Sequence, residues 1–535
     1  MKHHLKTSAV LALAALTAAC SGTARSNGKT TTYQLTAGTG TPRADLNSFT
    51  WSIYAEPTSI DYAQSFDYPP NQVLANVCES LLRWKPDLSY GPALASGYQN
   101  PTPTTWVYDI RPGVRFHDGT RLTADDVVTS LRRNLDPQVA SVWATAFRNV
   151  ESVTKTGPLQ VTVALKKPDS AFNQYMATAP GTIESAATLA KDGKGYGSPQ
   201  KGVNCTGPFS FGSWTPGQSI VLKRFDGYWD QTLKAHSGQV KFVFIPDPTA
   251  RINAFQSGEV DGGWMLPPAS YDQLKKGLYF GRSTTVADEV VSNLHGPLGD
   301  PRVRQALLMA TDRKGLISSG AGGVGDVANS LVTPNNWNNA PAAIRGQVSA
   351  ASPTYPYDVA KARALAKQAG VNGQQVVIAT SPLDTQTTIA TQAVAQAATA
   401  IGLKPKIDTI STDKYTALFT DPAARKGIDL FVTFWYTSIT DPLDMYVSLQ
   451  TGSFSNYGGW SNSAYDQAID QAIAASDPTA KAEATARAQK IALQQLPWLP
   501  LYAEPVSLYL GPKITGVAPS INYLYYPWAA SIGAK

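Results

Sequence analysis

Few residues in this chain combine the type and spacing that covalent chemistry requires. Beyond the first few residues, histidine occurs only as His117, His236 and His295, which are too far apart in sequence to suggest a metal site or a catalytic triad. The chain contains no H-E-x-x-H, G-x-S-x-G or P-loop motif, and no two carboxylates stand out as a glycosidase pair. We therefore expect a protein that is not an enzyme and that needs neither a cofactor nor a metal.

One glycine-rich segment, residues 320–325, formally fits the dinucleotide-binding pattern G-x-G-x-x-G. That pattern needs a strand before it and a helix after it, because the phosphates lie on the helix N-terminus. Here a helical pattern precedes the glycines, and no helical pattern follows them. We interpret the segment as a loop.

The three cysteines indicate an exported chain. Cys20 follows a short basic segment and an apolar stretch over residues 7–19 that is too short to cross a bilayer. The small residues before it resemble a lipobox, which predicts a signal peptide over 1–19 and lipidation of Cys20. An ordinary signal peptide with a chance cysteine is the alternative. Cys78 and Cys205 would then share an oxidising compartment, so we expect a disulfide between them in preference to two buried thiols.

Composition narrows the class of protein further. Hydrophobic residues make up 43% of the 535 residues and charged residues 16%, which provides for a large core and argues against disorder. The net charge of +6 comes without a dense run of Lys and Arg, so we expect no nucleic-acid partner. Residues 20–45 are rich in Ser, Thr and Gly, which is typical of a flexible tether.

The elements that must position any site alternate between strand and helix patterns from residue 46 onward, which predicts an α/β fold. Apolar residues at helical spacing predict a helix over 71–83, and residues 105–110 read as a strand. Thr123, with Asp126 three residues later, predicts a capped helix start. The apolar run 429–435 predicts a buried strand.

Several segments, taken in order, are similar to the family 5 bacterial extracellular solute-binding proteins, the receptors for dipeptides, oligopeptides and nickel. The resemblance covers nearly the whole chain after the tether. It is carried mainly by 106–120 (WVYDIRPGVRFHDGT), 205–209 (CTGPF), 226–229 (DGYW), 257–261 (SGEVD) and 300–306 (DPRVRQA).

This resemblance implies a two-lobed fold of the class II periplasmic-binding-protein type. A solute cleft lies between the lobes, which close around it by hinge motion in the manner of a Venus flytrap. Lobe I, with an extra subdomain, would span 46–292 and lobe II 293–500, with 501–535 returning to lobe I. The crossings would fall near Asn293 and Pro500.

The same resemblance predicts the solute site in Phe434–Pro442. In peptide-binding relatives a Trp in this segment packs on the ligand and an Asp holds its α-ammonium group. Here Ser438 occupies the place of that Asp, and a hydroxyl cannot neutralise a charge. We expect ligand contacts from Trp435, Tyr436, Thr437, Ser438, Asp441 and Glu56.

The serine leaves the nature of the solute open. Either another carboxylate replaces the missing Asp, or the solute lacks a free α-amine. A blocked peptide, an oligosaccharide, a siderophore-like molecule or a metal chelate would satisfy the second case. The candidate replacements are Glu56, Asp61, Asp67, Asp441 and Asp444.

Together these features favour a monomeric receptor that is lipid-anchored on the extracytoplasmic face of the cell membrane. It would capture a peptide or peptide-like solute and deliver it to the permease and ATPase subunits of an ABC importer. The main alternative is a signalling or chaperone lipoprotein that retains the fold. A secreted hydrolase is disfavoured by the lack of catalytic motifs.

Overall fold

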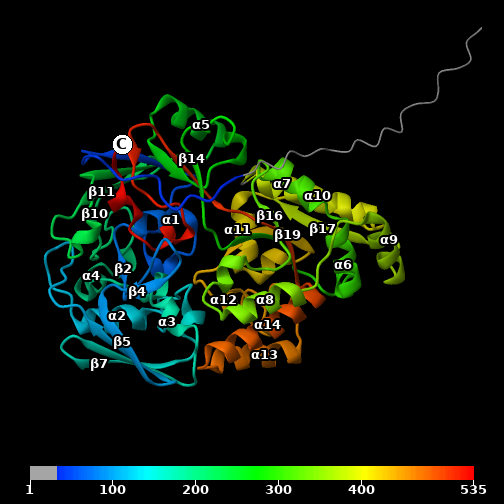
Figure 1. The fold of residues 1–535 in the computed structure, drawn as a ribbon, viewed down its shortest axis with the longest axis horizontal. Coiled ribbons are helices and arrows are strands. Elements are labelled where there is room, and N and C mark those ends of the chain that lie inside the picture. Colours follow the sequence, from blue (N-terminus) through cyan, green and yellow to red (C-terminus); the bar gives the residue numbers. More distant parts are fainter. Residues whose placement is uncertain (1–32, 383) are drawn as a thin grey trace, which may run out of the picture.

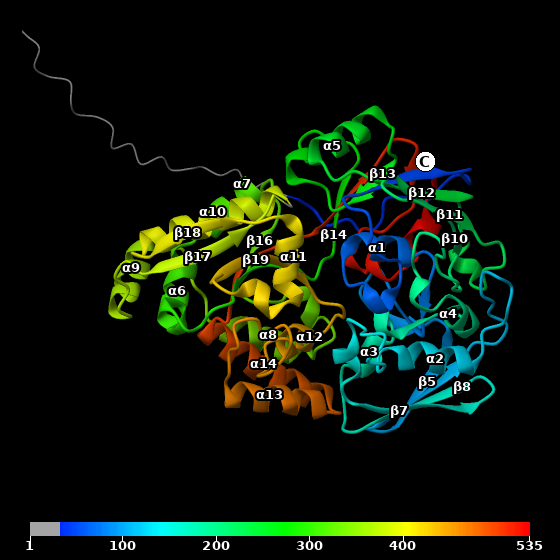
Figure 2. The same cartoon turned by 180° about the vertical axis from the view of Figure 1, so that it is seen from behind.

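The computed structural model describes residues 33–535 with the exception of 383, so the predicted signal peptide and Cys20 lie outside the described residues. Two lobes lie side by side, each built around a mixed sheet (Figure 1). The view from behind shows the same division, with most labelled helices of the C-terminal half gathered in one lobe (Figure 2). The predicted α/β class and two-lobed architecture are confirmed.

Lobe I is organised around β1 (Phe49–Ile53), which is buried almost throughout because parallel strands pair with it on both sides. Trp51 of this strand packs against Trp264 and Trp528 in the core. The strand order is β10 (Phe209–Thr215), β11 (Ser219–Arg224), β12 (Gln239–Phe244), β1, β13 (Gly262–Trp264), β21 (Val506–Leu510) and β14 (Leu278–Gly281). Helices α1 (Tyr68–Leu74) and α5 (Pro248–Ser257) also belong to this lobe.

A four-stranded antiparallel sheet forms the extra part of lobe I. Its order is β5 (Ala95–Thr102), β6 (Thr105–Ile110), β8 (Gln160–Leu165) and β7 (Val150–Gly157), so the predicted strand over 105–110 is confirmed. Helix α2 (Ala124–Arg133) begins at the predicted cap, where the Asp126 carboxylate accepts from the Thr123 N–H at 2.9 Å. The short helices α3 (Phe172–Tyr175) and α4 (Ala186–Asp192) complete this part.

Lobe II is built around a six-stranded sheet in which β15 (Thr285–Val291) and β19 (Leu430–Tyr436) pair antiparallel along their full length. The predicted strand over 429–435 is β19. The order is β16 (Asp326–Val327), β20 (Trp498–Ala503), β15, β19, β17 (Gln375–Thr380) and β18 (Lys404–Thr409). The helices are α6 (Pro301–Ala310), α7 (Arg313–Gly320), α8 (Ala342–Ala351), α9 (Val359–Gln368), α10 (Thr385–Ala400), α11 (Thr412–Thr420), α12 (Pro442–Val447), α13 (Ser463–Ala474) and α14 (Pro478–Gln495).

The chain crosses between the two large sheets twice. Residues 282–284 join β14 to β15, and residues 504–505 join β20 to β21. The first crossing comes earlier in the chain than the predicted boundary at 292/293, because all of β15 pairs with strands of lobe II. The second falls close to the predicted return at 501.

The helix predicted over 71–83 is correct only in its first part. Helix α1 ends at Leu74, and extended segments follow, including β3 (Leu82–Trp84). The Leu81 N–H donates to the Gly181 carbonyl at 3.0 Å. Hydrogen bonds to a distant segment thus replace those of a continuing helix, which the apolar periodicity alone does not reveal.

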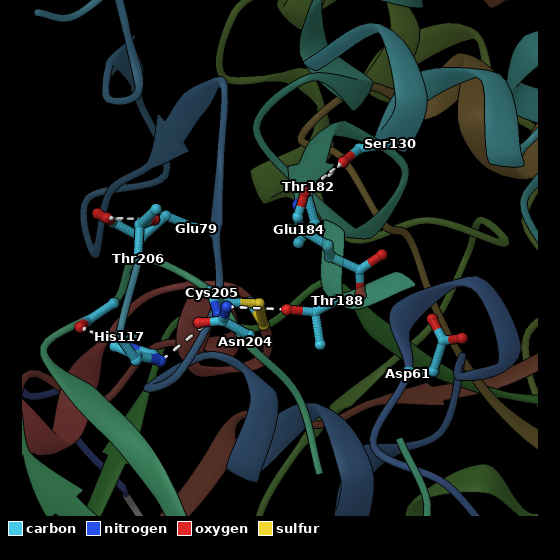
Figure 3. Close-up of a disulfide and its surroundings, with 12 residues drawn as sticks. Asp61, Glu79, His117, Ser130, Thr182, Glu184, Thr188, Asn204, Cys205 and Thr206 are labelled. Atoms are coloured by element: carbon cyan, nitrogen blue, oxygen red, sulfur yellow. Dashed lines mark hydrogen bonds between the residues drawn. A yellow bond between two sulfur atoms is a disulfide. The ribbon is translucent and has the colours of Figure 1, made fainter. Parts of the chain in front are cut away.

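A disulfide joins Cys78 to Cys205 within lobe I, with an S–S distance of 2.02 Å (Figure 3). It ties the chain after α1 to a segment that is also held by side-chain hydrogen bonds. Asn204 Nδ2 donates to Thr188 Oγ1 at 2.9 Å, and a ring nitrogen of His117 lies 3.0 Å from the Gly207 carbonyl. The bond therefore cross-links two parts of one lobe.

The described part of the predicted tether begins at residue 33 and follows the surface of both lobes. The Tyr33 hydroxyl donates to Asp326 of lobe II at 2.9 Å. The Thr36 N–H donates to the Phe280 carbonyl of lobe I at 2.7 Å. Over residues 33–45 the chain is thus attached to the folded body.

Candidate binding site between the lobes

Strand β19 leads into the predicted solute-binding segment, and its alternation divides the aromatic side chains between two faces. The ring of Tyr436 lies on the lobe I residue Tyr68, with centroids 5.1 Å apart. Trp435 packs edge-to-face on Trp498 in the core of lobe II, with centroids 5.3 Å apart. Solute contact by Trp435 remains a prediction, and its observed partner is structural.

Tyr436 and Thr437 are both held by neighbours. The Tyr436 hydroxyl donates to the Phe66 carbonyl at 2.6 Å and lies 3.2 Å from the Tyr525 hydroxyl. Thr437 is buried, and its hydroxyl accepts from Asn336 Nδ2 at 2.5 Å. The first residue therefore joins the two lobes, and the second fixes the loop that begins after β19.

Ser438 lies beside a carboxylate that comes from the helix following the loop. Its backbone N–H donates to one carboxylate oxygen of Asp444 at 2.7 Å. The other oxygen accepts from the Tyr175 hydroxyl of lobe I at 2.5 Å. Asp444 lies in the first turn of α12, so the start of this helix brings a negative group back to the serine.

The charge state of Asp444 is set mainly by burial. Burial raises the pKa of this carboxyl to about 6, and its hydrogen bonds from Tyr175 and Ser438 lower it less. Arg148, the basic side chain that acts on the pKa, is paired with Asp169 instead. Among the described residues, Asp444 forms no salt bridge.

Asp441, in contrast, is already neutralised. It caps α12 through the Leu443 N–H at 2.9 Å and forms an ion pair with Lys481 of α14. Gln174 of lobe I also donates to it, at 3.0 Å. Lys481 further donates to the lobe I carbonyl of Ser170 at 3.0 Å, so this group fastens the two lobes together.

The other candidate carboxylates lie elsewhere. Glu56 accepts from Trp214 Nε1 at 2.8 Å and from the Gly217 N–H at 2.9 Å, on the β10–β11 hairpin. Asp61 forms a salt bridge with Arg133 at 2.5 Å. Asp67 caps α1 and accepts from the Tyr54 hydroxyl at 3.1 Å. It therefore lies at the start of α1 and not beside Ser438.

A cavity of about 300 Å³ opens between the lobes next to Asp441. Its walls come from both sides of the interface, with Trp106 and Gln174 from lobe I and Trp337 and Lys481 from lobe II. Polar and aromatic groups in such a hollow suit a solute with both polar and apolar parts.

Four residues that surround the loop after β19 were not predicted as site residues. Tyr68, Tyr175, Tyr525 and Lys481 come from four separate parts of the chain, and no motif links them to the loop after β19. A high tyrosine content is typical of a hydrated binding surface, but it does not indicate which of the 24 tyrosines line the site.

The family model for bacterial extracellular solute-binding proteins, family 5 Middle, matches residues 89–457, which include β19 and the whole loop to Asp444. This chain belongs to that family. Among curated relatives, glutathione-binding protein GsiB of Escherichia coli strain K12 is 26% identical over 424 residues, or 77% of this chain and 80% of GsiB. This is consistent with the solute-binding fold described above.

Solved structures of the same architecture agree in fold. The binding protein AgaA of A. tumefacien R10, in complex with agropinic acid, has a TM-score of 0.79 at 22% identity and covers 91% of this chain and 99% of its own. The oligopeptide-binding protein AppA of Bacillus subtilis, in complex with a nonapeptide, has a TM-score of 0.78 at 21% identity. That match covers 92% of this solute-binding protein and all of AppA (100%).

Two further observations concern residues 33–382 and 384–535 only. No helix there has both the length and the apolar character needed to cross a membrane. No group of three or more His, Cys, Asp or Glu side chains there is placed to hold a metal ion.

Proposed function

We propose that this solute-binding protein is a non-catalytic receptor for a peptide or peptide-like solute with a free amino group. It passes the solute to the permease and ATPase subunits of an ABC importer. The proposal rests above all on Asp444, whose carboxylate lies against the backbone of Ser438 without a basic partner in the described chain. This carboxylate supplies the charge that the serine side chain lacks.

The electrostatics support an ammonium group as the missing partner. A carboxyl group whose pKa burial raises is costly to ionise, and a cation at hydrogen-bond distance offsets that cost. The surrounding hydroxyls of Tyr175, Tyr436 and Tyr525 can hydrogen-bond polar parts of a peptide-like molecule. Asp441 is excluded from this role because Lys481 already neutralises it.

The relatives support the same class of solute. GsiB is named for glutathione, a peptide with a free amino group, and AppA was solved with a nonapeptide. AgaA was solved with agropinic acid, so the fold also accepts molecules that are not ordinary peptides. For this chain the proposal specifies a cationic group of the solute at Asp444, and it specifies no particular peptide sequence.

We also propose that Cys20 carries a lipid that holds the protein on the extracytoplasmic face of the membrane, and that the chain acts as a monomer. The lipid would keep the receptor close to its permease. Mass spectrometry of the membrane fraction is the direct measurement: a chain that begins at a diacylated Cys20 supports the anchor, and a longer or unmodified N-terminus contradicts it.

In the central experiment, the purified protein is incubated with three tripeptide libraries that contain the same sequences and differ only in their terminal groups. Native mass spectrometry then identifies the peptides that stay bound. The first library has free termini, the second is N-acetylated, and the third has C-terminal amides. We expect retention from the first library and little from the N-acetylated one, and Asp444→Asn should abolish this preference. Retention of no peptide from any library would refute the proposed solute class.

A further inference from the structure

Arg251 lies at the edge of lobe I where a solute would meet the sheet. It is in the first turn of α5, which starts just after β12. Strand β12 runs parallel to β1, and Tyr54 follows the carboxyl end of β1 directly. In open α/β sheets, ligands bind in the crevice outside the carboxyl ends of the parallel strands.

The guanidinium group of Arg251 is largely buried and has no ion-pair partner among the described residues. The residue is 6% exposed, and both Nε and Nη1 lack a hydrogen-bond acceptor among the described residues. Burial lowers the pKa of Arg251 to about 10, and within the described chain only the Tyr54 hydroxyl acts against that shift. The group still carries its charge at neutral pH.

Two other arginines show that unpartnered burial is not the rule in this fold. Arg304 and Arg313 are equally buried, but each donates to backbone carbonyls. Arg304 Nε reaches the Gln495 carbonyl at 2.8 Å, and Arg313 Nη2 reaches the Tyr355 carbonyl at 2.5 Å. Because a buried unpaired charge is costly, the exception at Arg251 indicates a partner from outside the chain.

Arg251 is linked to the proposed site by a series of polar and aromatic neighbours. Next to it is Tyr54, whose hydroxyl donates to Asp67 at 3.1 Å. Asp67 caps the N–H of Tyr68, and the ring of Tyr68 lies on Tyr436, two residues before Ser438. Arg251 and Asp444 thus lie at opposite ends of this series of neighbouring residues.

We propose that Arg251 binds a carboxylate of the solute, so that the solute is a zwitterion. Its ammonium group lies at Asp444 and its carboxylate lies at the edge of lobe I. A guanidinium group can bind a carboxylate through two parallel N–H bonds, and such a pair would supply an acceptor to one of the two nitrogens that have none. This inference rests on the proposed function, because it assumes the ammonium site.

The test uses the third library, in which each C-terminal carboxylate is an uncharged amide. On the unaltered protein we expect about 10- to 100-fold lower retention than for the library with free termini, the loss expected for a charge-assisted hydrogen bond. Arg251→Met should bind the free-acid and amide libraries equally. Arg302→Met, which removes an exposed arginine of lobe II, should keep the full preference.

The outcomes separate the two proposals. Equal retention of free-acid and amide peptides by the unaltered protein overturns the role of Arg251 and leaves the peptide receptor standing. This comparison needs no variant, so it holds even if Arg251→Met fails to fold. Discrimination that survives in a folded Arg251→Met protein also overturns the inference, and retention of no peptide from any library refutes both proposals.

Discussion

The Ser438 backbone N–H donates to the Asp444 carboxylate at 2.7 Å, although the two residues stand six positions apart in the chain. The loop that ends in Asp441 and the first turn of α12 bring them together. A serine side chain that cannot neutralise an ammonium ion is thereby placed next to a carboxylate. This geometry leads to the first two predictions.

Replacing Asp444 with Asn should weaken binding of a peptide with a free amino group by about 10- to 100-fold, because a charged hydrogen bond becomes a neutral one. Isothermal titration calorimetry on a peptide recovered from the library experiment measures this directly. Glu151→Gln, an exposed change on β7, is the matched control and should have no effect. Unchanged affinity in Asp444→Asn would remove this residue from the site.

Binding of an amine should weaken as the pH falls through about 6, the pKa of Asp444 in the unliganded protein. A bound ammonium favours the ionised carboxyl, so below this pH each pH unit should cost up to ~10-fold in affinity. Without ligand the sign for stability is opposite. A raised acid pKa contributes stability below the unfolded value of 3.8, and this contribution is lost as the pH rises through about 6. Equal affinity at pH 5 and pH 7.5 would contradict the assignment.

Replacing Trp435 with Ala should lower the free energy of unfolding of the unliganded protein by about 2–3 kcal/mol, because the packing against Trp498 is lost. Denaturant unfolding without peptide measures this cost, and Trp435→Phe should recover much of it. If the Ala variant keeps full stability but loses peptide affinity, Trp435 contacts the solute as the sequence suggests.

Replacing Lys481 with Met should loosen the contact between the lobes. The change leaves the buried Asp441 carboxylate with Gln174 alone and removes the bond to Ser170, which should cost about 3 kcal/mol in stability. The radius of gyration from small-angle X-ray scattering should increase in the unliganded variant. Adding Asp441→Asn should restore part of the stability. An unchanged radius of gyration would show that this contact does not hold the lobes together.

Replacing Glu289 with Leu should raise the melting temperature at pH 7.5. Glu289 and its neighbour Asp288 on β15 are both 0% exposed, and their carboxylate oxygens have no hydrogen-bond partner among the described residues. Burial raises both pKa values well above the ordinary range, so their stabilising contribution is present at low pH and is lost as the pH rises.

The gain in melting temperature from Glu289→Leu should therefore shrink toward pH 4.5. At that pH the folded protein keeps Glu289 protonated, so its side chain is uncharged, as leucine is. The exposed Glu259→Leu serves as a control and should change the melting temperature little at either pH. A fall in the melting temperature of Glu289→Leu at pH 7.5 would mean that this carboxyl has a favourable partner in solution.

Local patterns in the sequence were enough to predict several secondary-structure elements. The Thr123–Asp126 cap, the strand Thr105–Ile110 and the strand Leu430–Tyr436 form where their side-chain types require, because each depends on neighbours within a few residues. The helix predicted over 71–83 stops early because its second half bonds to residues a hundred positions away, and no local pattern reports such bonds.

The candidate site divides in the same way. By itself, the sequence determined the family and the α/β class, and it predicted a solute-binding segment at Phe434–Pro442 with Ser438 in place of the expected Asp. Only the tertiary structure decided that Asp444 lies beside Ser438, that Lys481 pairs with Asp441, and that Arg251 has no ion-pair partner among the described residues. The physical reason is that the sequence gives each residue's type, whereas its charge state and its hydrogen-bond partners depend on which distant residues the fold places next to it.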